Sequence, residues 1–148
     1  MNVGHLALIS SSVFAGVALF VNIAEQPARL SLADQAMLLE WKISYRGGLA
    51  IQAPLAGVSG ALGLIAWGQS DELGFLVGAI LMIANWPWTL IVMRPTNRAL
   101  MAVSAADPAS PARALIIKWG TLHFARTLFG ALATIVFLIA CNHLVLRN

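Results

Sequence analysis

Three side chains that could take part in catalysis share one helical face near the start of the last apolar segment. Trp119, His123 and Arg126 are separated by four and then three residues, the spacing that places side chains on one face of an α-helix. An imidazole can accept or donate a proton near neutral pH, and a guanidinium can stabilise a negatively charged oxygen. Apolar packing does not require this combination, so we take this face as the first candidate for a functional site.

The composition indicates an integral membrane protein. Of the 148 residues, 59% are hydrophobic and 10% are charged, and the mean hydropathy is +0.82. Soluble domains carry about 25% charged residues, so a surface this poor in charge would not stay dispersed in water. The net charge of +3 comes from basic residues between apolar segments, a pattern of membrane topology rather than nucleic-acid binding.

Four apolar segments are long enough to cross a bilayer, which takes about 20 helical residues. We expect an all-α four-helix bundle in a single membrane domain, residues 1–148. The helices are predicted at about 5–24, 45–67, 73–94 and 116–142.

The segments between the spans have distinct patterns. Apolar and polar residues mix over about 31–43, which predicts a short interfacial amphipathic helix, either separate from the second span or continuous with it. Residues 94–113 are expected to form a polar connector. Pro108 and Pro111 cannot continue a helix, so 107–111 is predicted to be a turn.

The basic residues predict the orientation. Loops one and three contain all of the Lys and Arg residues found in the loops, and loop two contains none. By the positive-inside rule, loops one and three are expected to be cytoplasmic and both termini outside, in a bacterial inner membrane.

Glycines recur at every third position of the second span, at Gly57, Gly60 and Gly63. Small residues let helix backbones approach closely in lipid. We therefore expect this span either at the centre of the bundle or at the interface of a homodimer.

Antiparallel packing should gather polar residues from all four spans at one end of the bundle. The candidate site residues are Asn22, Glu25, Trp41, Tyr45, Gln52, Asn85, Asn97, Trp119, His123 and Arg126. Glu25 and Arg126 are expected to form an ion pair, and ionisable residues inside a membrane mark functional sites by default. A structural interpretation stays open: Arg126 can extend to the phosphates, the tryptophans can form an interfacial belt, and the cluster can be a polar clamp.

Metal binding is weakly indicated. The histidines are His5, His123 and His143, and the predicted topology places His5 and His143 at the opposite end from His123. Cys141 stands alone in an apolar run, and one His with one Glu would form an incomplete metal site. We therefore favour a site without a cofactor, while haem or metal bound by His123 alone stays open.

Four short motifs, in this order, resemble the anthrone oxygenase-like family of small four-helix membrane proteins. They are Asn22-x-x-Glu25-Gln26-Pro27-Ala28-Arg29, Trp41 with Tyr45-Arg46, Asn85-Trp86-Pro87-x-Thr89 leading to Pro95-x-Asn97-x-x-Leu100, and Trp119-x-x-x-His123-x-x-Arg126. The resemblance covers nearly the whole chain. It implies oxidation of an activated aromatic ketone by O2, as in the conversion of anthrones to anthraquinones.

This chemistry suggests roles for the matched residues. His123 would remove the acidic proton, Arg126 and Asn97 would stabilise the enolate oxygen, and Glu25 would hold His123 or Arg126 in place. The substrate would be lined by Trp119, Tyr45, Trp41, Asn22, Asn85 and Gln52.

The alternative is a non-catalytic membrane subunit, or a binder of a quinone, pigment or lipid within a larger complex. In either case the expected partners are the bilayer, a hydrophobic aromatic small molecule, and a second copy or a larger membrane complex, with no nucleic acid. A roomy cavity at the polar end favours catalysis or ligand binding, whereas a packed network without a void favours the structural role.

Overall fold

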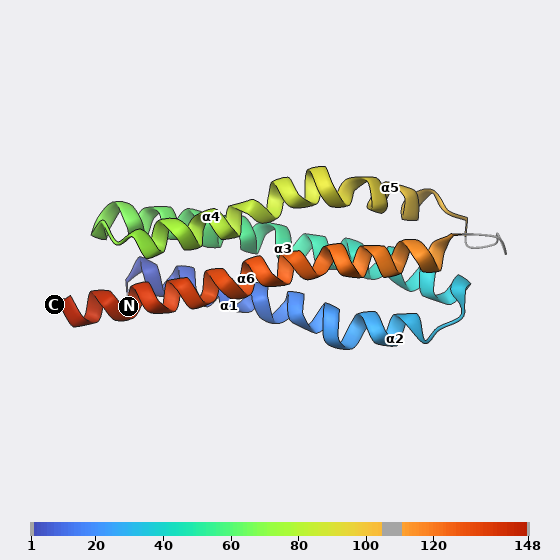
Figure 1. The fold of residues 1–148 in the computed structure, drawn as a ribbon, viewed down its shortest axis with the longest axis horizontal. Helices are drawn as coiled ribbons and strands as arrows, with labels where there is room; N and C mark the ends of the chain where they lie inside the picture. Colours follow the sequence, from blue (N-terminus) through green and yellow to red (C-terminus); the bar gives the residue numbers. More distant parts are fainter. Residues whose placement is uncertain (1, 105–110, 148) are drawn as a thin grey trace.

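Four long helical segments, each antiparallel to the next along the chain, make up the computed structural model, which describes residues 2–104 and 111–147 (Figure 1). The two termini and the α3–α4 turn lie at one end of the bundle, and the α2–α3 connection lies at the other. The elements are α1 (Val3–Phe20), η1 (Val21–Glu25), α2 (Gln26–Leu30), α3 (Asp34–Ser70), α4 (Leu73–Pro87), η2 (Trp88–Met93), α5 (Arg94–Ala102) and α6 (Ala112–Arg147).

Each of the four segments is long and apolar enough to cross a bilayer. The spans are Val3–Leu30, Asp34–Ser70, Leu73–Ala102 and Ala112–Leu146. Helices satisfy every backbone hydrogen bond internally, which lipid requires. The chain is therefore an all-α integral membrane protein, as the composition predicted.

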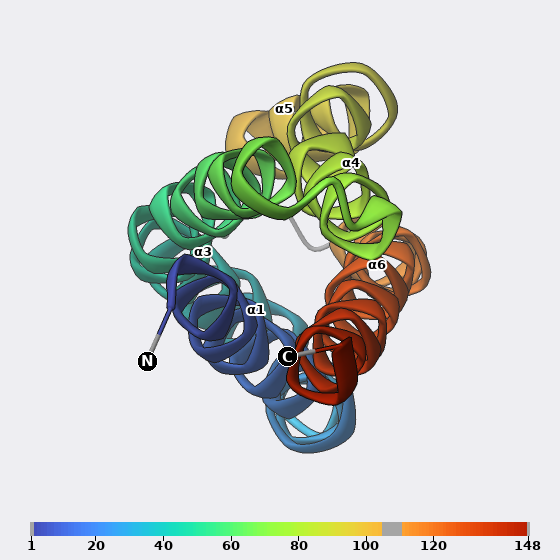
Figure 2. The same ribbon diagram turned by 90° about the vertical axis from the view of Figure 1, so that its left-hand side faces the viewer.

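The four segments form a ring when viewed along the bundle (Figure 2). α1 packs against α3 and α6, and α4 also packs against α3 and α6. Large apolar side chains cover the outer surface, as expected for contact with lipid. The interior combines small residues with three buried phenylalanines, Phe14, Phe75 and Phe137.

Two regions are more helical than the sequence predicted. The amphipathic segment at about 31–43 is not a separate helix, because α3 runs without interruption from Asp34 to Ser70. The first part of the expected connector is helix α5, with Pro95 in its first turn, where the missing N–H of proline is tolerated. Residues 107–110 of the predicted turn lie outside the described residues.

Two π-helical segments, η1 and η2, interrupt the first and third spans. In η1, the backbone N–H of Gln26 donates to the carbonyl of Val21, five residues earlier. Pro27 and Pro95 follow these segments, and a proline ring clashes with the carbonyl four residues before it. Those carbonyls belong to Ile23 and Ile91, inside η1 and η2, so the wider turn accommodates the rings. Such bulges often lie at functional sites.

Glycines in α3 and α4 make room for a ring from α6. A Cβ added at Gly63 or Gly78 would lie 2.8 Å or 2.4 Å from the nearest ring carbon of Phe137, and one at Gly60 would lie 2.6 Å from Ile83. The glycines of α3 therefore pack against other helices of the same chain, and α3 has no more central a place than the other spans, because the four segments form a ring.

Replacing Gly78 with alanine is expected to lower the free energy of unfolding by about 1–3 kcal/mol, the usual cost of overpacking a close-packed core. The added methyl group would overlap the Phe137 ring, which is fully buried and cannot move aside. Unfolding in mixed micelles would measure the change. Gly16→Ala is the matched control, because nothing lies within 4 Å of its added Cβ, and an equal loss there would contradict the explanation.

Candidate active site at the α2–α3 end

His123 is held by hydrogen bonds that join the first and last spans. Its Nδ1 lies 3.0 Å from Oδ1 of Asn22, and Thr127 donates to the same oxygen at 2.6 Å. The amide nitrogen of Asn22 donates to the carbonyl of Gly120 at 3.2 Å. His123 is 1% exposed, and Nε2 of its imidazole forms no hydrogen bond with any described residue. Asn22 belongs to η1, so the π-helical turn contributes directly to the site.

Aromatic rings enclose His123 on the side of α3. The ring of Trp119 stacks on the imidazole with centroids 4.9 Å apart, and the edge of Trp41 meets Trp119 at 5.8 Å. Trp41 in turn stacks on Tyr45 at 4.9 Å. These tryptophans are buried and therefore do not form an interfacial belt.

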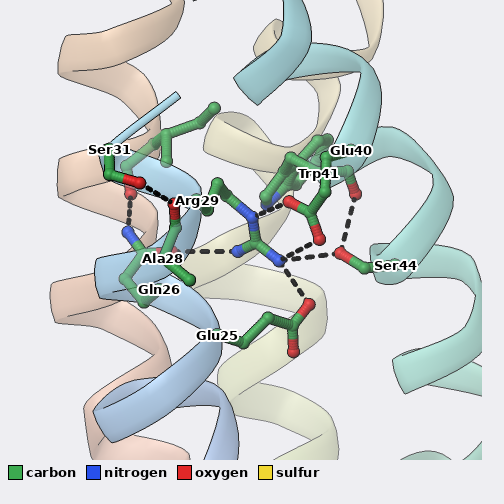
Figure 3. A network of polar contacts seen from close by, with 9 residues as sticks. Glu25, Gln26, Ala28, Arg29, Ser31, Glu40, Trp41 and Ser44 are labelled. Atoms are coloured by element: carbon green, nitrogen blue, oxygen red, sulfur yellow. Dashed lines mark hydrogen bonds and ion pairs between the residues drawn. The ribbon is translucent and has the colours of Figure 1, made fainter. Parts of the chain in front are cut away.

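Arg29 joins α2 to α3 through the network in Figure 3. Its guanidinium forms ion pairs with Glu25 and Glu40. It also donates to Oε1 of Gln26 at 2.9 Å and to Oγ of Ser44 at 2.7 Å. Arg29 is 2% exposed, so these acceptors replace the water that the guanidinium loses.

The expected ion pair between Glu25 and Arg126 is therefore wrong. Glu25 pairs with Arg29, which lies one helical turn away on the same face, and local pairs of this spacing form without any tertiary approach. Glu25 also does not hold His123, because Asn22 and Thr127 supply that network.

Gly120 allows α2 to approach α6 closely. A Cβ at this position would lie 2.6 Å from Nε2 of Gln26. That nitrogen donates to the carbonyl of Ile116 at 2.9 Å, while the oxygen of the same side chain accepts from Arg29. The glycine in the Trp119–Arg126 stretch therefore positions the Arg29 network against α6.

Arg126 is buried without an ionic partner among the described residues. It is 6% exposed, and its Nε has no hydrogen-bond partner. Its guanidinium carbon lies 5.7 Å from the centre of the Phe14 ring, within the range of a cation–π contact. Arg126 therefore does not extend to the phosphates. A buried charge without a partner is unfavourable, so this position suits an anionic ligand.

Three cavities that share lining residues lie at this end of the bundle; His123 lines only the smallest of them, and Arg126 lines the two smaller ones. A small one of about 30 Å³ contains Tyr45, His123 and Arg126 in its wall. A second of about 220 Å³ reaches Arg126 past Leu49 and Leu90. The largest, about 620 Å³, shares Tyr45 with the first and Leu49 and Leu90 with the second. We call the two larger cavities the α3–α5 groove, because α3, η2 and α5 supply most of their walls.

Buried polar atoms without hydrogen-bond partners concentrate around these cavities. In the described part of the chain they are Nε1 of Trp41, Oε1 of Gln52, Oδ1 of Asn85, Oδ1 of Asn97, Nε1 of Trp119 and Nε of Arg126. All of these residues except Trp41 line one of the three cavities. Buried polar groups are normally paired, and exceptions call for a missing water or ligand.

The structure brings the predicted site residues to one end of the bundle. Glu25, Gln52, Trp119 and Tyr45 join His123 and Arg126 around the small cavity. Asn97 and Asn85 lie on the walls of the groove instead, and Asn22 contacts His123 rather than a cavity. The roles assigned to these residues, other than that of Glu25, stay predictions.

Sequence reasoning missed several residues of this end. They are Glu40, Ser44, Leu49, Leu90 and Thr127, whereas Gln26, Arg29 and Thr89 stand in the motifs quoted above but were not assigned to the site. The Glu25–Arg29 spacing of four residues signals the ion pair, whereas nothing local in the sequence signals the groove.

No group of three or more His, Cys, Asp or Glu side chains with the geometry to hold a metal ion occurs in residues 2–104 and 111–147. Because Nδ1 of His123 is engaged by Asn22, a single-histidine haem or metal would have to bind through Nε2.

The chain is similar to known anthrone oxygenases. An anthrone oxygenase of Aspergillus fumigatus is 28% identical, with 88% of this chain and 87% of the relative aligned. Anthrone oxygenases of Claviceps purpurea and Paecilomyces divaricatus are 27% and 24% identical, over 84% and 88% of this chain and 80% and 89% of their own. These relatives are fungal and give no support to a bacterial inner membrane. No solved structure matches the chain significantly.

The family model described as anthrone oxygenase matches residues 41–136. This range includes Tyr45, Asn97, His123 and Arg126, and it covers well over half of the chain. The chain belongs to the anthrone oxygenase family.

Proposed function

We propose that this protein oxidises an anthrone, or a similar activated aromatic ketone, with O2 at the His123–Arg126 site. One observation carries the proposal: Arg126, which is buried without an anionic partner among the described residues, shares the cavity of about 30 Å³ with His123, whose Nδ1 is engaged by Asn22. A proton acceptor beside a cation that has no anionic partner is the arrangement needed to form and stabilise an enolate.

The α3–α5 groove suits a flat, largely apolar substrate. Its larger part, at about 620 Å³, falls in the range of small-molecule sites. Leu49 and Leu90 supply apolar walls, while Asn97 and Asn85 offer unpaired carbonyl oxygens that can accept from substrate hydroxyl groups. A fused-ring ketone would lie against the leucines with its reacting end toward Arg126.

The reaction begins with removal of one proton from the methylene carbon between the rings. Nε2 of His123 would accept this proton, and the electron pair would delocalise onto the ketone oxygen, where the Arg126 guanidinium would stabilise the negative charge. The enolate then transfers one electron to O2, and the resulting radical and superoxide combine to form a C–O bond. The product of this step is a peroxide anion.

The remaining steps return the proton and cleave the O–O bond. Protonated His123 would protonate the peroxide, then accept the second methylene proton as the O–O bond breaks and a C=O bond forms. The hydroxide that leaves takes the proton and becomes water. One anthrone and one O2 thus give one anthraquinone and one water, with four electrons passing from the methylene carbon to O2.

Oxygen uptake by the purified protein with an anthrone tests the proposal. The expected result is one O2 consumed per anthrone, one atom of labelled oxygen in the quinone, and a rate far above the spontaneous oxidation in empty micelles. Binding of the anthrone without any acceleration would contradict the proposal and would support the alternative of a non-catalytic ligand binder.

Leu49→Trp is expected to raise KM for the anthrone roughly tenfold, because the indole would fill space in the groove that the substrate needs, while kcat changes less. Leu49 lines all three cavities. Leu132→Trp is the control, because Leu132 is 49% exposed on the outer surface of α6. Unchanged KM in Leu49→Trp would place the substrate elsewhere.

We further propose that the site end of the bundle faces the cytoplasm, since loops one and three carry the basic residues. Gln35 and Gln69 are exposed at opposite ends, and each can be changed to Cys in a Cys141→Ser background. An impermeant maleimide should label Gln69→Cys in intact cells and leave Gln35→Cys unlabelled until the cells are opened. The opposite labelling pattern would reverse the orientation.

A further inference from the structure

The side-chain amide of Asn22 has only one orientation that satisfies its neighbours. One end of the amide lies 3.2 Å from the carbonyl oxygen of Gly120, which can only accept a hydrogen bond. That end must therefore be the NH2 group. The carbonyl oxygen Oδ1 then faces His123 and the hydroxyl of Thr127, at 3.0 Å and 2.6 Å.

This orientation determines which ring nitrogen of His123 carries the proton. Oδ1 of Asn22 can only accept, so Nδ1 of a neutral His123 must be the donor. Nε2 then carries the lone pair. In water the neutral histidine side chain favours the other tautomer, with the proton on Nε2, so the site selects the less common form.

We propose that Asn22 is a positioning residue that holds neutral His123 in the Nδ1–H tautomer and so makes Nε2 the proton acceptor. This inference rests on the proposed function, in which His123 removes a proton from the substrate. Asn22 itself lines none of the described cavities and acts only through the imidazole.

Two features of the surroundings support the assignment. The hydroxyl of Thr127 donates to the same Oδ1, which fixes the amide from a second side. Trp119 stacks on the imidazole at 4.9 Å, which restricts rotation of the ring away from Asn22. An amide also provides the acceptor without placing another charge inside the membrane, where charges are costly.

Nitrogen NMR of protein labelled with ¹⁵N-histidine, in lipid nanodiscs without substrate, reads the tautomer directly. The His123 signals are assigned by their loss in His123→Gln, since His5 and His143 also contribute. The wild type is expected to show a protonated Nδ1 and an unprotonated Nε2. A wild-type spectrum with the proton on Nε2 would overturn the inference.

Three variants extend the test. Asn22→Leu removes the acceptor and is expected to shift His123 toward the Nε2–H form and to lower kcat about tenfold or more, with KM changed little. Asn22→Asp keeps an acceptor oxygen and should restore the Nδ1–H form and much of kcat. Thr127→Val removes only the second donor to Oδ1 and should leave the tautomer unchanged.

The outcomes separate this inference from the proposed function. An unchanged tautomer in Asn22→Leu would overturn the inference, and so would an equal loss of kcat in Asn22→Leu and Asn22→Asp with the tautomer intact. A wild type that has the Nδ1–H form but does not accelerate anthrone oxidation would contradict the proposed function, because the spectrum is recorded without substrate.

Discussion

Replacing His123 with glutamine is expected to lower kcat for anthrone oxidation by about 10²–10⁴-fold, the usual contribution of a general base. The variant loses the Nε2 lone pair, while the glutamine amide can still donate to Oδ1 of Asn22 and fill most of the same space. KM should therefore change little. Steady-state oxygen uptake by the purified protein measures both constants.

His143→Gln is the matched control for this prediction. His143 lies near the C-terminus, at the opposite end of the bundle, and its side chain is 57% exposed. Its replacement should leave kcat unchanged. If His123→Gln keeps full turnover and the folded state is intact, another group accepts the proton and the assignment of the base is wrong.

Replacing Arg29 with methionine is expected to lower the free energy of unfolding by about 3 kcal/mol, the lower end of the cost of removing one partner from a buried ion pair. The change leaves the carboxylates of Glu25 and Glu40 close together without a cation between them. Their side chains are 23% and 35% exposed, so water compensates in part, which argues for the lower value. Denaturant titration in mixed micelles would measure the loss.

A combined variant distinguishes lost charge pairing from lost packing. Arg29→Met together with Glu25→Gln and Glu40→Gln removes all three charges and should recover most of the stability, because a neutral buried set is often as stable as an ion network. Lys118→Ala, at an exposed position of α6, should cost less than about 0.5 kcal/mol. A combined variant as unstable as Arg29→Met would assign the loss to packing.

The fold could be predicted from the sequence because few backbone structures are stable in lipid. Apolar segments of this length can cross a bilayer only as helices, and short connections make consecutive helices antiparallel. From these two facts, one can predict that Asn22, Tyr45, Asn97 and His123 lie at one end of the bundle, without any knowledge of side-chain contacts. The same argument explains why the ends of the helices were less well predicted, since hydropathy does not report where a polar helix such as α5 stops.

The partners within the site could not be read from the sequence. The antiparallel arrangement placed Glu25 and Arg126 at the same depth and led to the expectation that they pair, whereas Glu25 pairs with Arg29 four residues along the same helical segment. The close approach of α2 to α6 depends on Gly120, and Asn22, which contacts His123, lies in the π-helical turn of η1. Both are tertiary features that arise from side-chain volume and proline placement rather than from apolar patterning.

The length of α3 has a consequence for how a substrate would reach the groove. Its 37 residues extend roughly 55 Å, whereas the hydrocarbon core is about 30 Å thick. The helix is therefore longer than the hydrocarbon core is thick, and we expect the α5 side of the groove, which carries Arg94 and Arg98, to lie at the depth of the headgroups. A flat aromatic ketone concentrates at that depth, so it would arrive by lateral diffusion within one leaflet. The rate of turnover would then follow the number of substrate molecules per lipid rather than their concentration in the surrounding water.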